Sequence, residues 1–157
     1  MSRAVFSLAQ DSDKEQLLQL LSDRQDETNQ LRGQTGNVVK SRGGSYFDSV
    51  LQNENIWLIV GKIGDQLVAT ATIYVLPRIR NASHFAIIED VLVDKDFRGQ
   101  GIGTELMNYA IELCQQNPDV SKVKLGSLSE STDAHKFYEK LGFESKEKLF
   151  QKKLGER

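Results

Sequence analysis

The chain has 157 residues, the length of one ordinary globular domain with a single substantial core. Hydrophobic residues make up 39% of it and charged residues 27%, as in soluble globular proteins, and no apolar stretch approaches the ~20 residues that cross a bilayer. The formal net charge of −2 argues against nucleic-acid binding, which needs a clear basic surplus, so neither nucleic acid nor membrane is expected as a partner.

The first half of the chain predicts strands and helices in alternation. Residues 4–8 are typical of a short edge strand, and Asp11 or Ser12 can cap a helix that runs to about Ser22. Residues 23–44 are polar and almost without a periodic apolar signal, which predicts a long functional or mobile loop. A short helix over 45–52 and a hairpin of two strands, 56–62 and 66–76, follow.

In the second half, a loop over 77–83 leads to a third strand over 84–93 and then to a glycine-rich turn. An amphipathic helix over 101–116 follows, and then a strand over 121–128 and a short helix over 132–141 closed by Gly142. Residues 143–154 predict a final strand or hairpin arm. The order β-α-α-β-β-β-α-β-α-β predicts an α/β fold in a single domain over 1–157. The glycine turn lies where open α/β sheets bind ligands.

Two further features bear on the location of the protein. The first six residues lead too soon into the acidic run 11–15 for a secretory signal. The single cysteine, Cys114, excludes an internal disulfide and fits a reducing compartment. We therefore expect a cytoplasmic protein.

The glycine turn is the most informative segment of the sequence. It reads Arg98-Gly99-Gln100-Gly101-Ile102-Gly103-Thr104. Its alternate glycines leave the backbone without side chains that would keep a ligand away, and the first amides of the following helix have no intrahelical partner. Arg98 can add a bidentate grip on an anion. The turn predicts a pyrophosphate-containing ligand, and the alternative is that the glycines only make a tight strand-to-helix turn.

Two common phosphate-binding motifs do not match this turn. The dinucleotide motif needs the spacing G-x-G-x-x-G, whereas these glycines alternate at 99, 101 and 103. A Walker loop needs a lysine between its last glycine and the Ser or Thr, and Gly103-Thr104 has none. Neither a dinucleotide site nor a Walker site is therefore expected.

Three segments resemble the GNAT superfamily of N-acetyltransferases. The pattern Arg98-x-x-Gly101-x-Gly103 is similar to the acetyl-CoA loop of that family, residues 134–143 to a motif near its C-terminus, and residues 88–93 to the strand before the loop. The resemblance covers essentially the whole chain. It implies a mixed, mostly antiparallel central sheet flanked by helices, and acetyl-CoA as co-substrate. No metal is expected, and relatives of this kind are frequently homodimers.

The resemblance also implies a set of residues that bind the coenzyme, largely through the backbone of the loop. They are Val91, Leu92, Val93, Arg98, Gly99, Gln100, Gly101, Ile102, Gly103, Thr104, Ser131 and Phe137. Lys140 is a further candidate by its charge, for the ribose phosphate of the coenzyme, and a solvated lysine is its alternative. Backbone N–H groups around residues 91–93 would stabilise the thioester oxygen as it gains charge. Ser131 stands where many relatives have an asparagine, so it reaches the pantetheine arm with a shorter side chain.

Acetyl transfer to an amine needs a base for the amine and an acid for the departing thiolate. Glu89 is the expected base, acting through a water, with Asp90 as second choice and an ordinary solvated carboxylate as the alternative. Strand alternation sends these two side chains to opposite faces unless a bulge intervenes, and the resemblance implies such an irregularity. Tyr138 is the expected acid, and a core aromatic is its alternative.

The acceptor pocket is expected between the polar loop 23–44, the helix that follows it and the loop 78–83. Arg32, Arg42, Arg78 and Arg80 could hold an anionic amine there, and Asp90 could contact the acceptor. The predicted function is acetyl-CoA-dependent transfer to a primary amine of a small molecule by direct attack in a ternary complex. The alternatives are acetylation of a protein lysine or N-terminus, and a non-catalytic acetyl-CoA sensor.

Overall fold

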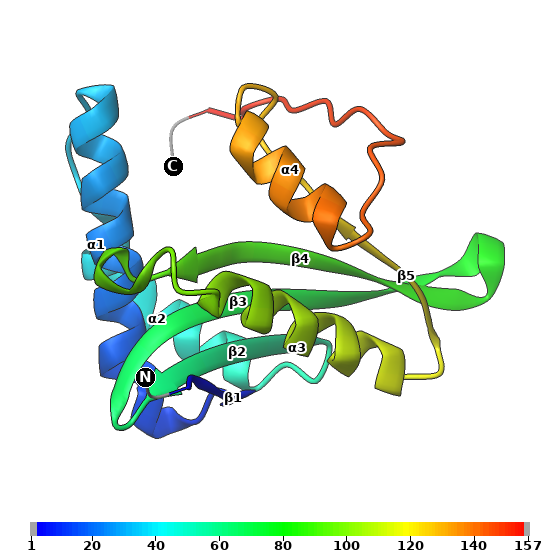
Figure 1. The fold of residues 1–157 in the computed structure, drawn as a ribbon, viewed down its shortest axis with the longest axis horizontal. Helices are drawn as coiled ribbons and strands as arrows, with labels where there is room; N and C mark the ends of the chain where they lie inside the picture. The colour runs from blue at the N-terminus through cyan, green and yellow to red at the C-terminus, as the bar shows by residue number, and fades with distance from the viewer. Residues whose placement is uncertain (1–2, 156–157) are drawn as a thin grey trace. The chain divides into compact units, whose positions relative to one another are not determined.

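The structure, a computed structural model, describes residues 3–155 (Figure 1). The chain divides after Lys124 into two compact units. The first unit holds the central sheet as far as Lys124 and the helices α1, α2 and α3, and the second holds α4 with the chain around it. No helix within residues 3–155 is both long enough and apolar enough to span a membrane. A single domain over the whole chain stays a prediction.

The sheet has five strands in the spatial order β1-β2-β3-β4-β5. They are Val5–Leu8, Ile56–Ile63, Gln66–Arg78, Ser83–Val93 and Val120–Leu125. The first four strands pair antiparallel. β4 and β5 begin side by side, because His84 N donates to Asp119 O at 2.8 Å and Ser121 Oγ donates to His84 O at 3.2 Å. They therefore run in the same direction, and the predicted mixed, mostly antiparallel sheet is confirmed.

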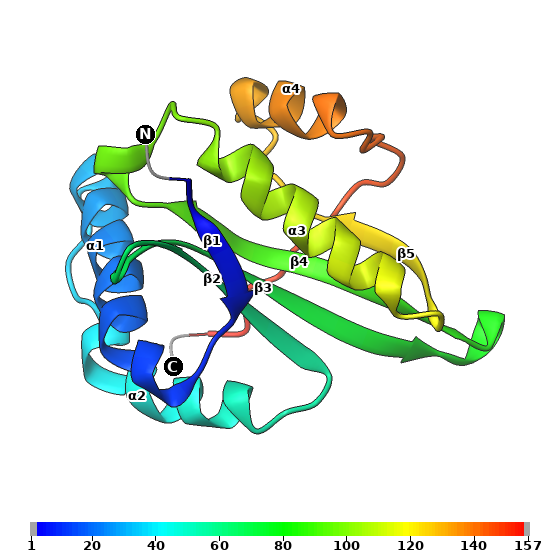
Figure 2. The same ribbon diagram turned by 60° about the horizontal axis from the view of Figure 1, so that its bottom comes forward.

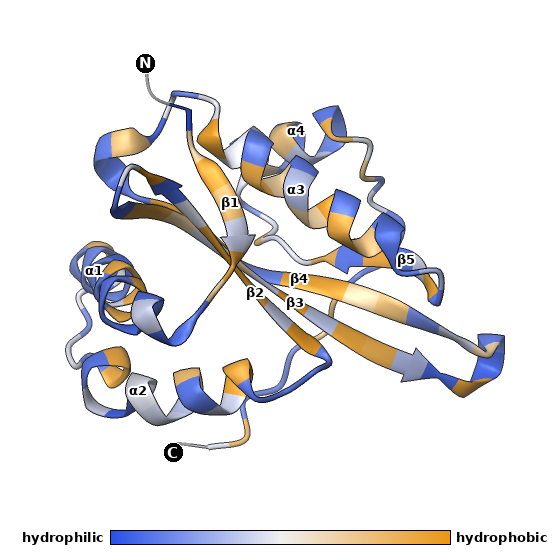
Figure 3. Cartoon of the chain, turned by 90° about the horizontal axis from the view of Figure 1, so that it is seen from below, coloured by the Kyte–Doolittle hydropathy of each residue, from blue (hydrophilic) through white to orange (hydrophobic). Residues whose placement is uncertain are grey.

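Helices cover both faces of this sheet (Figures 2 and 3). α1 (Lys14–Arg32) and α2 (Val38–Leu51) lie on one face. Their shared core with the sheet consists of Leu17, Leu20, Phe47, Leu58, Val60, Leu67 and Leu92. α3 (Ile102–Gln116) lies on the other face and contacts β3 and β4. Ile102, Leu106, Ala110 and Cys114 recur at every fourth position and are buried, as the amphipathic pattern predicted, so burial of this stripe holds the helix on the sheet.

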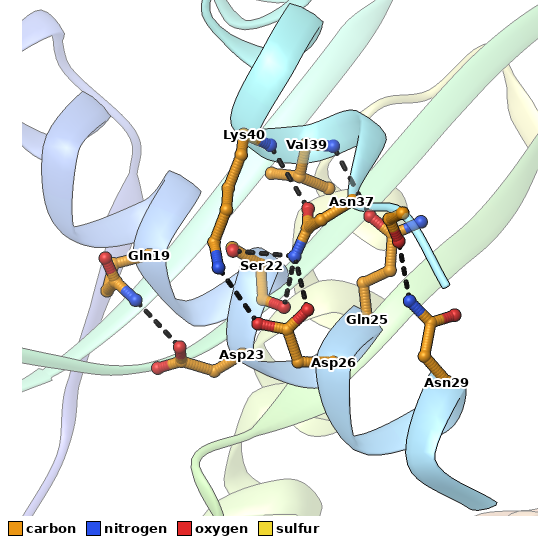
Figure 4. Close-up of polar contacts among 10 residues, drawn as sticks. Gln19, Ser22, Asp23, Gln25, Asp26, Asn29, Asn37, Val39 and Lys40 are labelled. Carbon is orange, nitrogen blue, oxygen red and sulfur yellow. Dashed lines mark hydrogen bonds and ion pairs between the residues drawn. The ribbon is translucent and has the colours of Figure 1, made fainter. Parts of the chain in front are cut away.

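The predicted long loop over 23–44 is wrong, because most of it is helical. α1 continues to Arg32 and α2 already begins at Val38, so the connection is only 33–37. Side-chain hydrogen bonds, rather than apolar burial, hold the second half of α1 against the start of α2 (Figure 4). Asn37 caps α2 and donates to Ser22 Oγ and to Asp26 Oδ1, both at 2.9 Å, and Lys40 Nζ pairs with Asp26 at 3.1 Å. A polar helix of this kind shows little apolar periodicity in its sequence.

The second unit contains α4 (Thr132–Lys140), which ends where Gly142 adopts φ +90° and donates its N–H to Glu139 O at 3.0 Å. The helix and its glycine stop are confirmed. The predicted final strand over 143–154 is wrong, since the structure shows no strand there. Much of that segment is Lys and Glu, which are weak strand formers, and its apolar residues Leu149, Phe150 and Leu154 are exposed.

Candidate active site

β4 carries a bulge just before the glycine turn. The β3 partner of Glu89 is Thr72, whereas the partner of Leu92 is Thr70, so three steps along β4 match two steps along β3. Asp90 within this step has φ +54°, a left-handed conformation that few residues other than glycine adopt. The irregularity implied by the family resemblance is therefore confirmed.

The bulge decides which side of the sheet each carboxylate occupies. Residues directly opposite each other in a ladder share a face, so Glu89 and Leu92 both lie on the face of Thr70 and Thr72. Leu92 is buried in the core under α1 and α2, which identifies that face. Glu89 therefore points to the side of the sheet that α1 and α2 cover, and both Glu89 and Asp90 are exposed to solvent.

Tyr74 is a further residue near Glu89 and Asp90, and the sequence analysis did not predict it. It lies two residues from Thr72 on β3 and thus on the same face as Glu89. Burial, together with the negative charges of Asp90 and Glu89, raises the pKa of Tyr74. Its phenol therefore stays protonated near both carboxylates. Tyr74 follows Thr70 and Thr72 at the two-residue spacing of one strand face. The sequence could have indicated Tyr74 only if the register between β3 and β4 had been known.

The end of β4 extends beyond its neighbour. β5 has 6 residues and β4 has 11, and the two strands start together, so the bulge and the residues after it run past the end of β5 within the first unit. The backbone N–H and C=O groups on that edge of β4 are therefore not paired by β5. The sequence predicts that the thioester oxygen meets the backbone of residues 91–93 on this part of β4, and that stays a prediction.

The glycine turn follows directly. A short 3₁₀ turn, Lys95–Phe97, is fixed by Asp94, whose side chain accepts the N–H of Asp96 at 2.9 Å. Gly99 has φ +76° and Gly101 has φ +82°, and a methyl group added to either would meet nothing within 4 Å. The two glycines are thus needed for their conformation, while the space in front of them is open.

The start of α3 supplies the donors of this site. Gly101 is the N-cap and has no side chain, and the first intrahelical bond runs from Glu105 N to Gly101 O at 3.1 Å. The amides of residues 102–104 therefore have no partner within the helix and carry the positive end of its dipole. Such a helix start, beside open backbone, can bind phosphate oxygens.

Arg98 is partly engaged with the protein itself. Its Nε donates to Val93 O at 3.0 Å, which closes the loop back onto the end of β4. Its Nη2 pairs with Glu27 of α1 at 3.3 Å, and Glu27 also binds Arg24 at 3.1 Å. The predicted grip of Arg98 on pyrophosphate stays a prediction, and the structure adds Glu27, which the sequence analysis did not single out.

The remaining predicted residues lie in the second unit. Tyr138 packs edge-on between Phe137 and Phe143, with ring centroids 5.2 and 6.1 Å away. Burial raises the pKa of Tyr138, so its phenol is protonated at neutral pH. Ser131 is the N-cap of α4, and Lys140 is exposed at its last position.

The arginines predicted for the acceptor are not gathered in one place. Arg32 ends α1, whereas Arg78 and Arg80 lie at the tip of the β3–β4 hairpin, on the opposite side of the first unit (Figure 1). Arg78 stacks over the ring of Phe85 at 5.7 Å. Arg42 lines a groove of about 510 Å³ between α1 and α2. The structure does not bring Arg32 into one pocket with the hairpin arginines.

Carboxylates, imidazoles and thiols do not gather into a metal site in the part of the chain that the structure describes: no group of three or more lies together within residues 3–155. Within the first unit, the end of β4 carries two exposed carboxylates, with the phenol of Tyr74 near them.

Comparison with known proteins identifies the family. The sequence profile of the acetyltransferase (GNAT) family matches residues 16–143. An uncharacterized N-acetyltransferase of Methanocaldococcus jannaschii is 47% identical over 62 residues, which cover 40% of this chain and 27% of that protein. Glucosamine 6-phosphate N-acetyltransferase of Trypanosoma brucei brucei is 35% identical over 86 residues, 53% of this chain and 54% of that protein.

The matches thus span a quarter to about half the length of these curated relatives. Among solved structures, a protein of Agrobacterium tumefaciens, provisionally described as an acetyltransferase, superposes with a TM-score of 0.80 and 27% identity over 95% of this chain and 99% of that chain. The profile match covers most of the chain and the fold agrees. The chain belongs to the acetyltransferase (GNAT) family.

Proposed function

We propose that this protein transfers an acetyl group from acetyl-CoA to a primary amine of a small molecule, by direct attack within a ternary complex. One observation carries the donor half of this proposal. The open backbone at Gly99 and Gly101 lies directly before the unpartnered amides that begin α3. A pyrophosphate fits that combination of space and donors, and members of this family generally use acetyl-CoA.

The bulged end of β4 would receive the thioester. Its backbone runs past β5, so N–H groups in 91–93 are available to stabilise the carbonyl oxygen as negative charge develops on it. Glu89 lies on the same strand, exposed and two positions before this stretch. In this proposal Glu89 takes a proton from the amine through a water.

The amine nitrogen bonds to the thioester carbon as the carbon–sulfur bond breaks, Glu89 takes the proton that the amine loses, and Tyr138 gives a proton to the thiolate. Burial raises the pKa of Tyr138, so its phenol is protonated when the thiolate forms. Asp90 stays the second candidate for the base, because its left-handed backbone places it beside Glu89 at the bulge.

A small amine is favoured over a protein acceptor by the relative from Trypanosoma brucei brucei, whose name gives glucosamine 6-phosphate as its substrate. Asp90 and the arginines 32, 78 and 80 remain candidates for contacting the acceptor. Since the hairpin arginines and Arg32 lie on opposite sides of the first unit, an anionic acceptor could use one of these groups but not both.

The proposal is tested with calorimetry and a thiol-release assay on the whole chain. We expect acetyl-CoA to bind, and coenzyme A to be released in the presence of at least one member of a panel of amino sugars, amino sugar phosphates, aminoglycosides and polyamines. Release only with lysine peptides would favour the protein-acetylating alternative. Tight binding of acetyl-CoA without release by any amine would favour the sensor, and absence of binding would refute the donor assignment.

A further inference from the structure

Glu27 of α1 contacts Arg98 of the coenzyme loop, 71 residues away in the sequence. The distance from Arg98 Nη2 to Glu27 Oε2 is 3.3 Å, and Arg24 Nη1 binds the same oxygen at 3.1 Å from the other side. The side chain of Glu27 is only 28% exposed, less than either arginine. One carboxylate thus ties the glycine turn to the helix that flanks it.

The contacts of Arg98 fix its guanidinium in one orientation. Nε is held by the carbonyl of Val93, the last residue of β4, and Nη2 by Glu27. Both nitrogens lie on one edge of the planar group. The other edge, formed by Nη1 and the second hydrogen of Nη2, binds nothing among residues 3–155 and can still donate two parallel hydrogen bonds to a phosphate.

From this geometry we propose that Glu27 is a positioning residue for acetyl-CoA binding, acting through Arg98. The inference rests on the proposed function, because it takes the ligand at the glycine turn to be the coenzyme. Glu27 holds the arginine in the rotamer that presents its free edge, so this side chain does not have to be ordered when the pyrophosphate arrives. An arginine loses considerable rotamer freedom when it is fixed, and preorganisation removes part of that cost from binding.

The charge state of Glu27 supports the same role. Burial works against ionisation of this carboxyl, but hydrogen bonds from Arg24 and Arg98, with the charges of both arginines, outweigh it and lower the pKa of Glu27. Glu27 is therefore ionised at neutral pH. Arg24 also offsets its negative charge, which limits the repulsion between Glu27 and an incoming pyrophosphate.

The opposite role makes the opposite prediction. If Glu27 only competed with the pyrophosphate for Arg98, then Glu27→Gln would free the arginine and strengthen the binding of acetyl-CoA. If Glu27 positions Arg98, the same change weakens binding. Asp23→Asn is the matched control, since it removes one negative charge from the same helix at an exposed residue that accepts only from Gln19.

The experiment measures the acetyl-CoA dissociation constant by calorimetry for wild type, Glu27→Gln, Asp23→Asn, Arg98→Gln and the double variant Glu27→Gln/Arg98→Gln. We expect Glu27→Gln to weaken binding about threefold or more, a size that fits a partly exposed ion pair, and Asp23→Asn to leave it unchanged. In the Arg98→Gln background, Glu27→Gln should have no further effect. Steady-state kinetics should show the change in the KM for acetyl-CoA, with kcat within about twofold of wild type.

Equal or tighter binding by Glu27→Gln overturns the inference, and so does an undiminished effect in the Arg98→Gln background. Thermal unfolding of each variant identifies a general loss of structure, which would lower Tm and kcat together. If wild type itself fails to bind acetyl-CoA, the proposed function fails and the inference fails with it. If wild type binds and Glu27→Gln behaves like Asp23→Asn, only the inference fails.

Discussion

Glu89 stands directly opposite Thr72 in the β3–β4 ladder, on the face of the sheet that α1 and α2 cover. This pairing places an exposed carboxylate one position before Asp90, at the bulge. The side chain is thus held by a regular strand residue, whereas Asp90 depends on a strained one. That difference in support is why we propose Glu89, ahead of Asp90, as the positioned base.

Glu89→Gln should lower kcat/KM about 10²-fold or more at pH 7, because it removes the group that accepts the proton of the amine. The glutamine is close in size, so Tm should hardly change. The loss should shrink as the pH of the assay rises toward the pKa of the amine, which then supplies its own neutral form. Asp90→Asn is the comparison, and a larger loss in that variant would assign the base to Asp90 instead.

Tyr138→Phe should lower kcat about tenfold to a hundredfold while leaving the fold intact. The phenyl ring keeps the edge-on contacts with Phe137 and Phe143, and only the hydroxyl is lost. Tyr109→Phe is the matched control, since Tyr109 stacks on Phe6 at 5.9 Å in the first unit and has no part in the proposed chemistry. Equal activity of the two variants would show that Tyr138 is a core aromatic.

Gly101→Ala should destabilise the protein by about 1–2 kcal/mol, because a side chain at φ +82° is strained even though nothing crowds it. The strain should also distort the turn and weaken acetyl-CoA binding. Gly44→Ala should instead stabilise the protein by about 0.5–1 kcal/mol, because Gly44 lies inside α2. The added methyl group has room, since the nearest atom, Lys14 Cε, is 3.5 Å away. Urea unfolding measures both changes, and a stable Gly101→Ala would contradict the role of the turn.

Asp13 should make the protein sensitive to acid. It is 2% exposed, pairs with Lys62 and accepts the N–H of Gln10 at 2.8 Å. Burial opposes ionisation, but the hydrogen bonds from Lys62 and Gln10 and the charge of Lys62 outweigh it, so the pKa of Asp13 is lowered. A lowered pKa contributes stability above the unfolded value of about 3.9, and this contribution is lost as the pH falls through the folded value.

Asp13→Asn should therefore cost about 2 kcal/mol at pH 7, where Lys62 loses its partner, and much less near pH 2. Chemical unfolding at both pH values measures the difference. A constant cost across this range would mean that the charge of Asp13 contributes nothing.

Cys114 should not react with thiol reagents in the folded protein. Its side chain is buried in α3 at 1% exposure, and burial raises the pKa of its thiol to about 11, so almost no thiolate forms at pH 8. An aromatic disulfide reagent should label it only after denaturant is added. This makes thiol release a clean assay for the wild-type chain, and rapid labelling without denaturant would contradict the burial.

The parts of the fold that the sequence predicted well are those with a strong apolar period or a glycine signal. α3 showed a buried stripe, and Gly142 marked the end of α4. α1 was cut short at Ser22 because its second half is held by Asn37 and Asp26 rather than by apolar burial. Contacts that join distant parts of the chain leave no local pattern in the residues that make them.

The same limit applies to the site. The glycine turn could be found because its conformation demands glycine at 99 and 101. Tyr74 and Glu27 could not, because the first depends on strand register and the second on which helix lies beside the turn. A lone tyrosine or glutamate is common on any surface, and only the fold distinguishes these two.

The extra residue at the bulge also reverses which face of the sheet each later side chain of β4 occupies. Before it, Ile88 pairs with Ile73 on the α3 side, and four positions later Leu92 is buried on the α1 side, although uninterrupted alternation would place both on one side. Deleting Asp90 would therefore do more than remove a charge. It would turn the side chain of Leu92 out of the core, and the glycine turn would begin on the opposite face of the sheet. A chain without Asp90 would therefore lose the whole site.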